Sequence, residues 1–229
     1  MTINQRFHRV ALLEGLSEAQ QLHLEDVGSE VAFTRGEDLF RQGDPADALY
    51  LVLRGRVKLV RHAPTGASTI LDVLSVGDDL DIASVVEGRM FGTSARALSD
   101  GMAWRLPTVA FRRLLAEWPP LAGNLLRLMA VRQRQTVESL SALASLNIEG
   151  RLCRILSDLC RRYGIVGDCR GVILDLGLTR QDFADLTGTT LETGIRGLNR
   201  LRSQGLIQWE GRRFFVPDIK GLEGVIAAA

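Results

Sequence analysis

The segment that most constrains the fold of this chain is residues 179–201, which reads as two short helices joined by a tight turn. Thr179 is suited to cap the first helix, and Asp182, three residues later, is a short substitute for the glutamate of a capping box. Gly188 marks the turn, because a left-handed backbone costs least in a residue without Cβ. Thr190 then caps the second helix. The spacing therefore predicts a hairpin of two helices.

The second helix of this hairpin carries polar side chains close to its N-terminus, namely Glu192, Thr193, Arg196 and Arg200. A DNA major groove accepts a helix of this kind, in which glutamate accepts a hydrogen bond from cytosine N4 and arginine forks onto guanine O6 and N7. We therefore expect a helix-turn-helix unit that reads bases through Glu192 and Arg196. An ordinary surface hairpin is the alternative interpretation.

The distribution of charge supports the DNA-binding interpretation. The 229 residues are 46% hydrophobic and 24% charged, which is normal for a globular protein of one large or two ordinary domains. The net charge is only +1, but residues 1–118 carry 13 basic and 16 acidic side chains, whereas residues 119–229 carry 15 and 11. The basic excess lies in the half that contains the helical hairpin and has the sign that a phosphate backbone requires.

The N-terminal half has the texture of a β-domain. After a short helix over residues 17–26, short apolar runs alternate with Gly, Pro and Asp turns from Val31 to Pro107. Strands this short, with turn signals roughly every 8–12 residues, predict a sandwich or jelly roll that can enclose a small ligand. A short helix over 109–117 follows, and Trp118-Pro119-Pro120 ends it.

A helical pattern then runs without interruption from Leu121 to about Leu146. It carries two apolar stripes, formed by Leu121, Leu125 and Leu128 and by Val137, Leu140 and Ala144. A long helix with apolar residues at both ends of one face is typical of a dimer seam. The polar stretch over residues 132–136 either is solvated or meets a ligand. Further elements are expected at residues 148–163 (helix), 172–174 (strand), and 206–209 with 213–216 (a β-hairpin, or wing).

Three cysteines, Cys153, Cys160 and Cys169, have no CxxC spacing. Cys153 and Cys160 lie seven residues apart on a predicted helix, so they share one face and are expected to be reduced, buried and apolar in character. The chain has no apolar run of about 20 residues and no apolar segment at its start. These features predict a cytoplasmic protein without a signal peptide or a membrane span.

Several fragments, in the same order along the chain, resemble one known family. Residues 36–47 and 53–59 look like its β-roll signatures, residues 93–98 stand where its phosphate cassette ends, and residues 146–152 resemble its hinge. The family is the CRP/FNR superfamily of bacterial transcription regulators, relatives of the cyclic-AMP receptor protein. The resemblance covers essentially the whole chain. It implies a homodimer that binds double-stranded DNA, contacts RNA polymerase and is not an enzyme.

The resemblance also implies an α+β fold in three parts. These are an N-terminal β-jelly-roll domain of the cyclic-nucleotide-binding type (residues 1–118), a dimerisation helix (119–146) and a C-terminal winged helix-turn-helix (147–229). The first domain would bind a small effector, and a shift of the dimerisation helix would re-space the two DNA-reading helices. The expected effector pocket is lined by Leu80, Asp81, Ile82, Thr93, Ser94, Arg132, Thr136 and Val137.

Departures from the family pattern argue against cyclic AMP as this effector. Family members that bind cyclic nucleotides carry Gly-Glu where this chain has Asp81-Ile82, and an arginine where it has Thr93. Loss of a buried charged partner costs several kcal/mol, on the order of 3–5, and Asp81 adds negative charge. The matching hydroxyl pair on the long helix becomes Thr136-Val137. We therefore expect no cyclic-nucleotide binding.

Other effectors are weighed in the same way. The iron–sulfur sensors of the family need four thiolates, and the first 152 residues contain no cysteine, so the sequence excludes such a cluster. Haem stays open, although His8, His23 and His62 are the only histidines. A small anion such as a 2-oxo acid also stays open, because Arg132 lies where related sensors place a helix arginine, but Asp81 opposes it. The last alternative is a regulator that needs no ligand.

The resemblance sharpens the DNA prediction. Family members of the FNR type have an apolar residue directly before the glutamate and tolerate thymine, and Leu191 stands there, so a TTGA-like inverted repeat is expected. Ile195 occupies the second position of this code. Phosphate contacts are expected from Thr179, Arg180, Thr190, Thr193 and Arg200. Gly194 and Gly197 weaken the helix, by about 1 kcal/mol each relative to alanine. In the alternative function, the winged helix of an effector-sensing module makes protein contacts.

Overall fold

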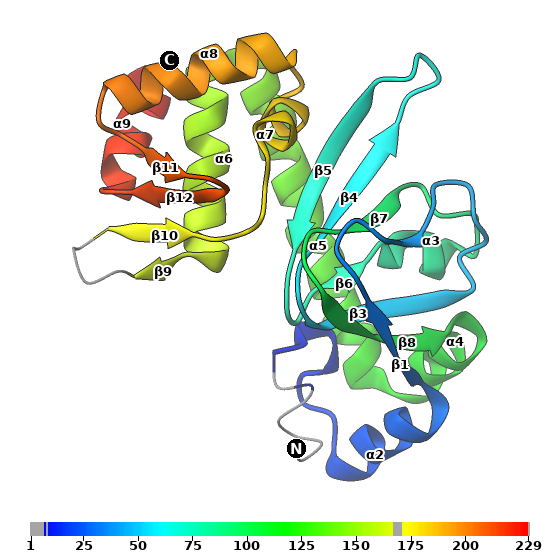
Figure 1. The fold of residues 1–229 in the computed structure, drawn as a ribbon. Coiled ribbons are helices and arrows are strands. Elements are labelled where there is room, and N and C mark those ends of the chain that lie inside the picture. The colour runs from blue at the N-terminus through cyan, green and yellow to red at the C-terminus, as the bar shows by residue number, and fades with distance from the viewer. Residues whose placement is uncertain (1–6, 8, 167–170, 229) are drawn as a thin grey trace. The chain divides into compact units, whose positions relative to one another are not determined.

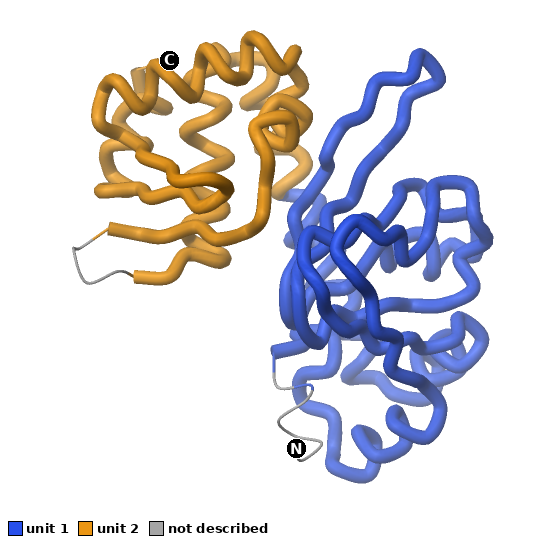
Figure 2. Tube along the Cα trace, in the orientation of Figure 1, with its two compact units in different colours: residues 1–134 blue, residues 135–229 orange. Residues whose placement is uncertain are grey.

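The structure is a computed structural model that describes residues 7, 9–166 and 171–228. It divides into two compact units, residues 1–134 and 135–229 (Figure 2), which are described separately. Helix α5 (Pro119–Ser145) crosses the division. Among the described residues, no helix combines the length and the apolar character that crossing a membrane would require.

The first unit is a roll of two antiparallel four-stranded sheets, with strand orders β1-β8-β3-β6 and β2-β7-β4-β5 (Figure 1). A 3₁₀ turn (Ala11–Leu13) precedes α2. The helices of this unit besides α5 are α2 (Glu18–Val27), α3 (Ile82–Glu87) and α4 (Thr108–Glu117). The strands are β1 (Ser29–Phe33), β2 (Asp38–Phe40), β3 (Ala48–Arg54), β4 (Val57–His62), β5 (Ser68–Leu74), β6 (Asp79–Leu80), β7 (Ser94–Ala97) and β8 (Gly101–Pro107). The jelly roll predicted for this half is confirmed.

The two sheets enclose the apolar core of the first unit. Leu51 of β3 and Leu106 of β8 are almost fully buried in it, as is Phe111 of α4. The start of α5 completes this core, since Leu121 and Leu125 are buried there. The first apolar stripe of the long helix therefore packs inside its own unit. The expectation that both stripes belong to one dimer seam is wrong for this stripe.

Over its described residues, the second unit combines a four-stranded antiparallel sheet, of order β11-β12-β10-β9, with four helices besides the end of α5. Its elements are α6 (Ile148–Tyr163), β9 (Ile165–Val166), β10 (Val172–Leu174), α7 (Arg180–Thr187), α8 (Leu191–Ser203), β11 (Gln208–Glu210), β12 (Arg213–Val216) and α9 (Ile219–Ala228). Phe183 of α7 packs on Phe214 of β12 with ring centroids 4.7 Å apart, and both are buried. The helical hairpin and the wing are thus parts of one domain.

The local signals of the sequence account for most of these elements. Thr179 and Asp182 form the expected capping box of α7, and Gly188 ends that helix in the left-handed region with φ 64°. Cys153 and Cys160 are buried on one face of α6, and burial raises the pKa of each thiol to about 12. Cys169 lies outside the described residues. The elements that were not predicted include α3, β9 and the C-terminal helix α9.

Candidate nucleic-acid interface and effector pocket

Helix α8 presents its polar residues to solvent. The Thr190 hydroxyl accepts a hydrogen bond from the backbone N–H of Thr193 (3.3 Å), which fixes the first turn. The side chains of Glu192 and Arg196 are 82% and 65% exposed, and the nearest carboxylate and guanidinium atoms are 3.9 Å apart. An exposed pair at this distance contributes little to stability, so both groups can exchange their partner for a base edge.

Gly194 and Gly197 let helix α8 approach its neighbours closely. A Cβ atom at position 194 would lie 3.0 Å from the Cβ of Ala184 in α7. A Cβ atom at position 197 would lie 2.6 Å from Cδ1 of Leu152 and 3.3 Å from Cγ2 of Ile148, both in α6. The two glycines thus serve packing against α7 and α6.

Several residues that were expected to contact DNA phosphates make contacts within this chain. The Thr179 hydroxyl is already used in the capping box of α7, and that of Thr190 in the cap of α8. Arg180 of α7 and Arg202 of α8 both lie over the ring of Trp209 in β11, at 5.5 and 4.7 Å from its centroid. The aromatic ring of the wing therefore holds two cations beside the hairpin, a role that the sequence analysis did not assign to Trp209.

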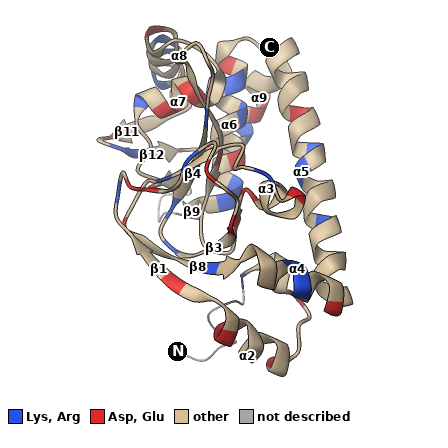
Figure 3. Cartoon of the chain, turned by 90° about the vertical axis from the view of Figure 1, so that its right-hand side faces the viewer, with Lys and Arg blue, Asp and Glu red and all other residues tan. Residues whose placement is uncertain are grey.

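Arg200 makes an ion pair that the sequence did not predict. Its guanidinium donates to Glu149 at the start of α6 over 2.7 Å, and the Glu149 side chain is only 23% exposed. The pair borders a depression of about 280 Å³ between α6 and α8, lined by Asn147, Ile148, Glu149, Thr193, Arg196, Gly197 and Arg200. Basic and acidic residues recur along α6 in Figure 3. Arg200 is thus tied to α6 in this structure.

In the first unit, Asp81 and Thr93, both expected at the effector pocket, are hydrogen-bonded to each other. Asp81 precedes α3 with φ 50°, and it is the one non-glycine residue with positive φ in the part of the chain that is described. Its Oδ2 accepts hydrogen bonds from the Thr93 hydroxyl (3.0 Å) and the Gly92 backbone N–H (3.1 Å). Leu80 and Ile82 on either side are fully buried in the core.

Arg132 of α5 is paired within the same unit. Its Nη2 donates to the Asp79 carboxylate (2.8 Å) and to the Asp79 carbonyl oxygen (3.3 Å). The Asp79 side chain is 4% exposed and that of Arg132 is 31% exposed. Burial raises the pKa of Asp79, although the Arg132 charge opposes this shift. Arg132 was predicted at this pocket from the sequence, whereas its acidic partner Asp79 was not.

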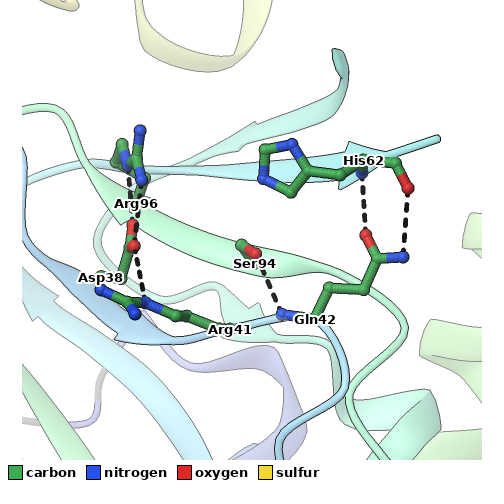
Figure 4. Close-up of a pocket in the computed structure, with 6 residues that line it drawn as sticks. All are labelled: Asp38, Arg41, Gln42, His62, Ser94 and Arg96. Carbon is green, nitrogen blue, oxygen red and sulfur yellow. Dashed lines mark hydrogen bonds and ion pairs between the residues drawn. The ribbon is translucent and has the colours of Figure 1, made fainter. Parts of the chain in front are cut away.

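Ser94 faces a different place from Thr93, its neighbour in the chain. Its Oγ accepts a hydrogen bond from the backbone N–H of Gln42 (2.9 Å). It borders a surface depression of about 400 Å³ (Figure 4), lined by Asp38, Arg41, Gln42, His62, Ser94 and Arg96. Arg96 donates twice to Asp38, over 2.7 and 3.0 Å, and this contact lowers the pKa of Asp38. Thr136 and Val137 belong to the second unit, and both are exposed.

The histidines that were considered for haem have other neighbours. His23 packs edge-on against Trp118 with ring centroids 5.9 Å apart, and His62 Nδ1 lies 2.9 Å from the Ser68 hydroxyl. His8 lies outside the described residues. In the part of the chain that the structure covers, no three His, Cys, Asp or Glu side chains gather into a group that could hold a metal ion.

Comparison with known proteins shows which protein families this chain is similar to. Residues 30–117 match the cyclic nucleotide-binding domain, and residues 150–225 match the Crp-like helix-turn-helix domain. A global nitrogen regulator of Synechococcus elongatus is 31% identical over 186 residues, which cover 80% of this chain and 83% of the relative. A CRP-like cAMP-activated global transcriptional regulator of Mycobacterium tuberculosis is 29% identical over 215 residues, 93% of this chain and 95% of the relative.

A solved structure shares the fold as well. FixK2 from Bradyrhizobium japonicum aligns with a TM-score of 0.78 at 23% identity, over 89% of this chain and 99% of that one. An effector-type β-roll, a long helix and a winged helix-turn-helix define a DNA-binding transcription regulator rather than an enzyme. The chain belongs to the CRP/FNR family.

Proposed function

We propose that this chain is a homodimeric, sequence-specific regulator that reads a TTGA-like inverted repeat through helix α8. The observation that carries the proposal is the exposed pair of Glu192 and Arg196 on successive turns of that helix. Leu191 before the pair is 41% exposed, and Ile195 is half-buried. Arg180 and Arg202, held on Trp209, supply positive charge for the phosphate backbone, which positions the helix without specifying sequence.

The dimer is proposed to form along α5. Exposed residues at heptad spacing follow one face of this helix, namely Leu126, Ala130, Gln133, Val137, Leu140 and Ala144. Leu126, Val137 and Leu140 are 72%, 59% and 61% exposed in the single chain. Mostly apolar side chains at alternating spacings of three and four residues are the pattern of a two-helix seam, and burial of Leu126, Val137 or Leu140 is worth about 1.5–3 kcal/mol each.

The seam is tested by Leu140→Glu, which places a charge at its centre. Light scattering should show a monomer for this variant and a dimer for the native protein. Ser141→Glu is the matched control. It lies one residue further on, is not one of the six seam residues, and should remain dimeric. A monomeric native protein, or a dimeric Leu140→Glu variant, would contradict the proposed seam.

The operator is tested by fluorescence anisotropy with duplexes that carry TTGA half-sites about one helical turn, ~34 Å, apart. Glu192→Ala should relax base preference at one position of the half-site by ~1–3 kcal/mol, whereas Arg180→Ala should weaken all sequences alike. If both variants lose affinity uniformly across a randomised library, the division into base-reading and phosphate-contacting residues is wrong. If the native protein ignores every inverted repeat at low salt, the protein-contact alternative is favoured.

We further propose that any effector of this protein is one other than cyclic AMP. Ile82 stands where cyclic-nucleotide binders carry an acidic residue and is fully buried, and the Thr93 hydroxyl already donates to Asp81. By family resemblance, the DNA-bound dimer acts on RNA polymerase in the cytoplasm. Calorimetry with cyclic AMP tests the first point, and micromolar binding would overturn it.

A further inference from the structure

Two sets of anion-binding donors in the first unit are occupied by this chain's own carboxylates. The Gly92 N–H and the Thr93 hydroxyl converge on a single oxygen of Asp81, at 3.1 and 3.0 Å. The Arg132 guanidinium reaches the carboxylate and the carbonyl of Asp79, at 2.8 and 3.3 Å. A backbone N–H, a hydroxyl and a guanidinium are the groups that hold phosphate or carboxylate ligands in proteins.

Both arrangements are unfavourable in isolation, which indicates that the surrounding fold maintains them. Asp81 adopts φ 50°, a conformation that costs free energy in residues other than glycine. Asp79 is nearly excluded from water, and burial of a carboxylate is tolerated only when a charged or hydrogen-bonding partner is supplied. Arg132 supplies the charge, and the Ile82 backbone favours the ionised form further.

We propose that Asp79 and Asp81 are built-in substitutes for an anionic effector. They satisfy the donors of the first unit, so that the native protein takes up no small anion there and binds its operator without one. This inference rests on the proposed function for its DNA-binding consequence. The ion pair of Asp79 and Arg132 also links strand β6 to helix α5, so the contact that an effector would make between roll and long helix is already present.

Charge repulsion argues against the alternative, in which an additional anion binds beside the carboxylates of Asp79 and Asp81. An incoming phosphate would meet the carboxylates of Asp79 and Asp81, and Asp78 adds a third negative charge that already disfavours ionisation of Asp79. The guanidinium of Arg132 is engaged with Asp79. An anion can therefore enter only by displacing an internal carboxylate.

Asp81→Gly is the decisive variant, because glycine tolerates positive φ better than any other residue. It keeps the backbone conformation, frees the Thr93 hydroxyl and leaves the Gly92 N–H with the Ser84 hydroxyl (3.1 Å) in place of the Asp81 carboxylate. We expect inorganic phosphate to raise the melting temperature of Asp81→Gly, and its operator binding to rise severalfold with added phosphate. Sodium chloride at matched ionic strength should have no such effect. Thr93→Val in the same background should abolish the response.

The controls separate this effect from a change in net charge. Glu87→Gln removes one negative charge at the end of the same helix, α3, and should behave as the native protein does, with no melting shift in phosphate and full operator binding after exhaustive dialysis. Asp79→Asn is the second variant, and its operator binding should fall severalfold because Arg132 loses its charged partner.

Two results would overturn the proposal: native protein that needs an added anion to bind the operator, or an Asp81→Gly variant that melts cooperatively and ignores phosphate. Failure of the proposed function has a different signature. In that case no duplex is bound by the native protein, while the phosphate-dependent melting of Asp81→Gly still reports the anion site.

Discussion

The contact between Gly197 of α8 and Leu152 of α6 allows a quantitative test of how α8, the proposed DNA-reading helix, is positioned. In Gly197→Ala the new Cβ atom would lie 2.6 Å from Cδ1 of Leu152, whereas carbon atoms pack at about 3.5–4.0 Å. Leu152 is fully buried and cannot turn into solvent. Either this side chain leaves its rotamer or α8 moves away from α6 by a substantial part of 1 Å.

Two opposing terms determine the result. Replacement of glycine by alanine within a helix stabilises by about 1 kcal/mol, and overpacking of a filled core costs about 1–3 kcal/mol. Gly224→Ala in α9 measures the helix-propensity term alone, since position 224 is exposed and a Cβ atom there meets nothing within 4 Å. Both variants gain the helix propensity, so the difference between their unfolding free energies, about 1–3 kcal/mol, is the overpacking cost.

Thermal unfolding measures this difference. For a unit of this size, 1 kcal/mol corresponds to about 4–8 °C in melting temperature, so Gly197→Ala should melt at least ~4 °C below Gly224→Ala. Hydrogen exchange should locate the loss of protection in α6 and α8. Leu152→Val in the Gly197→Ala background should restore part of the stability. Equal stabilisation by Gly197→Ala and Gly224→Ala would refute the packing argument. Strictly additive effects of Gly197→Ala and Leu152→Val would refute it as well.

Three further predictions concern other parts of the molecule. With pKa values of about 12, the Cys153 and Cys160 thiols should resist iodoacetamide in the folded protein at pH 8 and react once it is unfolded, as read by peptide mass spectrometry. Asp38→Asn should lower the unfolding free energy at neutral pH, because Arg96 lowers the pKa of Asp38. That difference from the native protein should vanish as the pH falls through the native pKa, as followed by denaturation at several pH values. Trp209→Leu should weaken binding to specific and random duplexes by a similar factor of a few, because two arginines lose their aromatic support.

What the sequence could predict was determined by residues close together in the chain. The capping box of Thr179 and Asp182 spans three residues, and Gly188 follows within one helix length, so the hairpin could be placed from local chemistry alone. The short strands and their glycine turns predicted the roll in the same way. Helix α9 was missed because Gly221 and Gly224 lower its helix propensity, and its stability comes instead from packing on α6.

The contacts around the proposed effector pocket were harder to predict, because the paired residues are distant in sequence. Asp79 and Arg132 are 53 residues apart, and neither position marks the other by spacing or composition. Pairing of Glu149 with Arg200, 51 residues apart, escaped notice for the same reason. The presence of Gly194 and Gly197 within a helix is likewise explained by residues distant in sequence, because α7 and α6 pack closely against them.

These long-range contacts have one consequence for how the molecule works. Residues that read bases must change partners when DNA arrives, and Glu192 and Arg196, for which we propose this role, are exposed and weakly paired at 3.9 Å. The groups that hold the helices and the roll in place are paired at 2.7–2.8 Å, and each pair includes a buried or half-buried carboxylate, as in Glu149 with Arg200 and Asp79 with Arg132. Replacing Glu192 or Arg196 should therefore change which sequence is bound, whereas removing one of these carboxylates should weaken binding to every sequence.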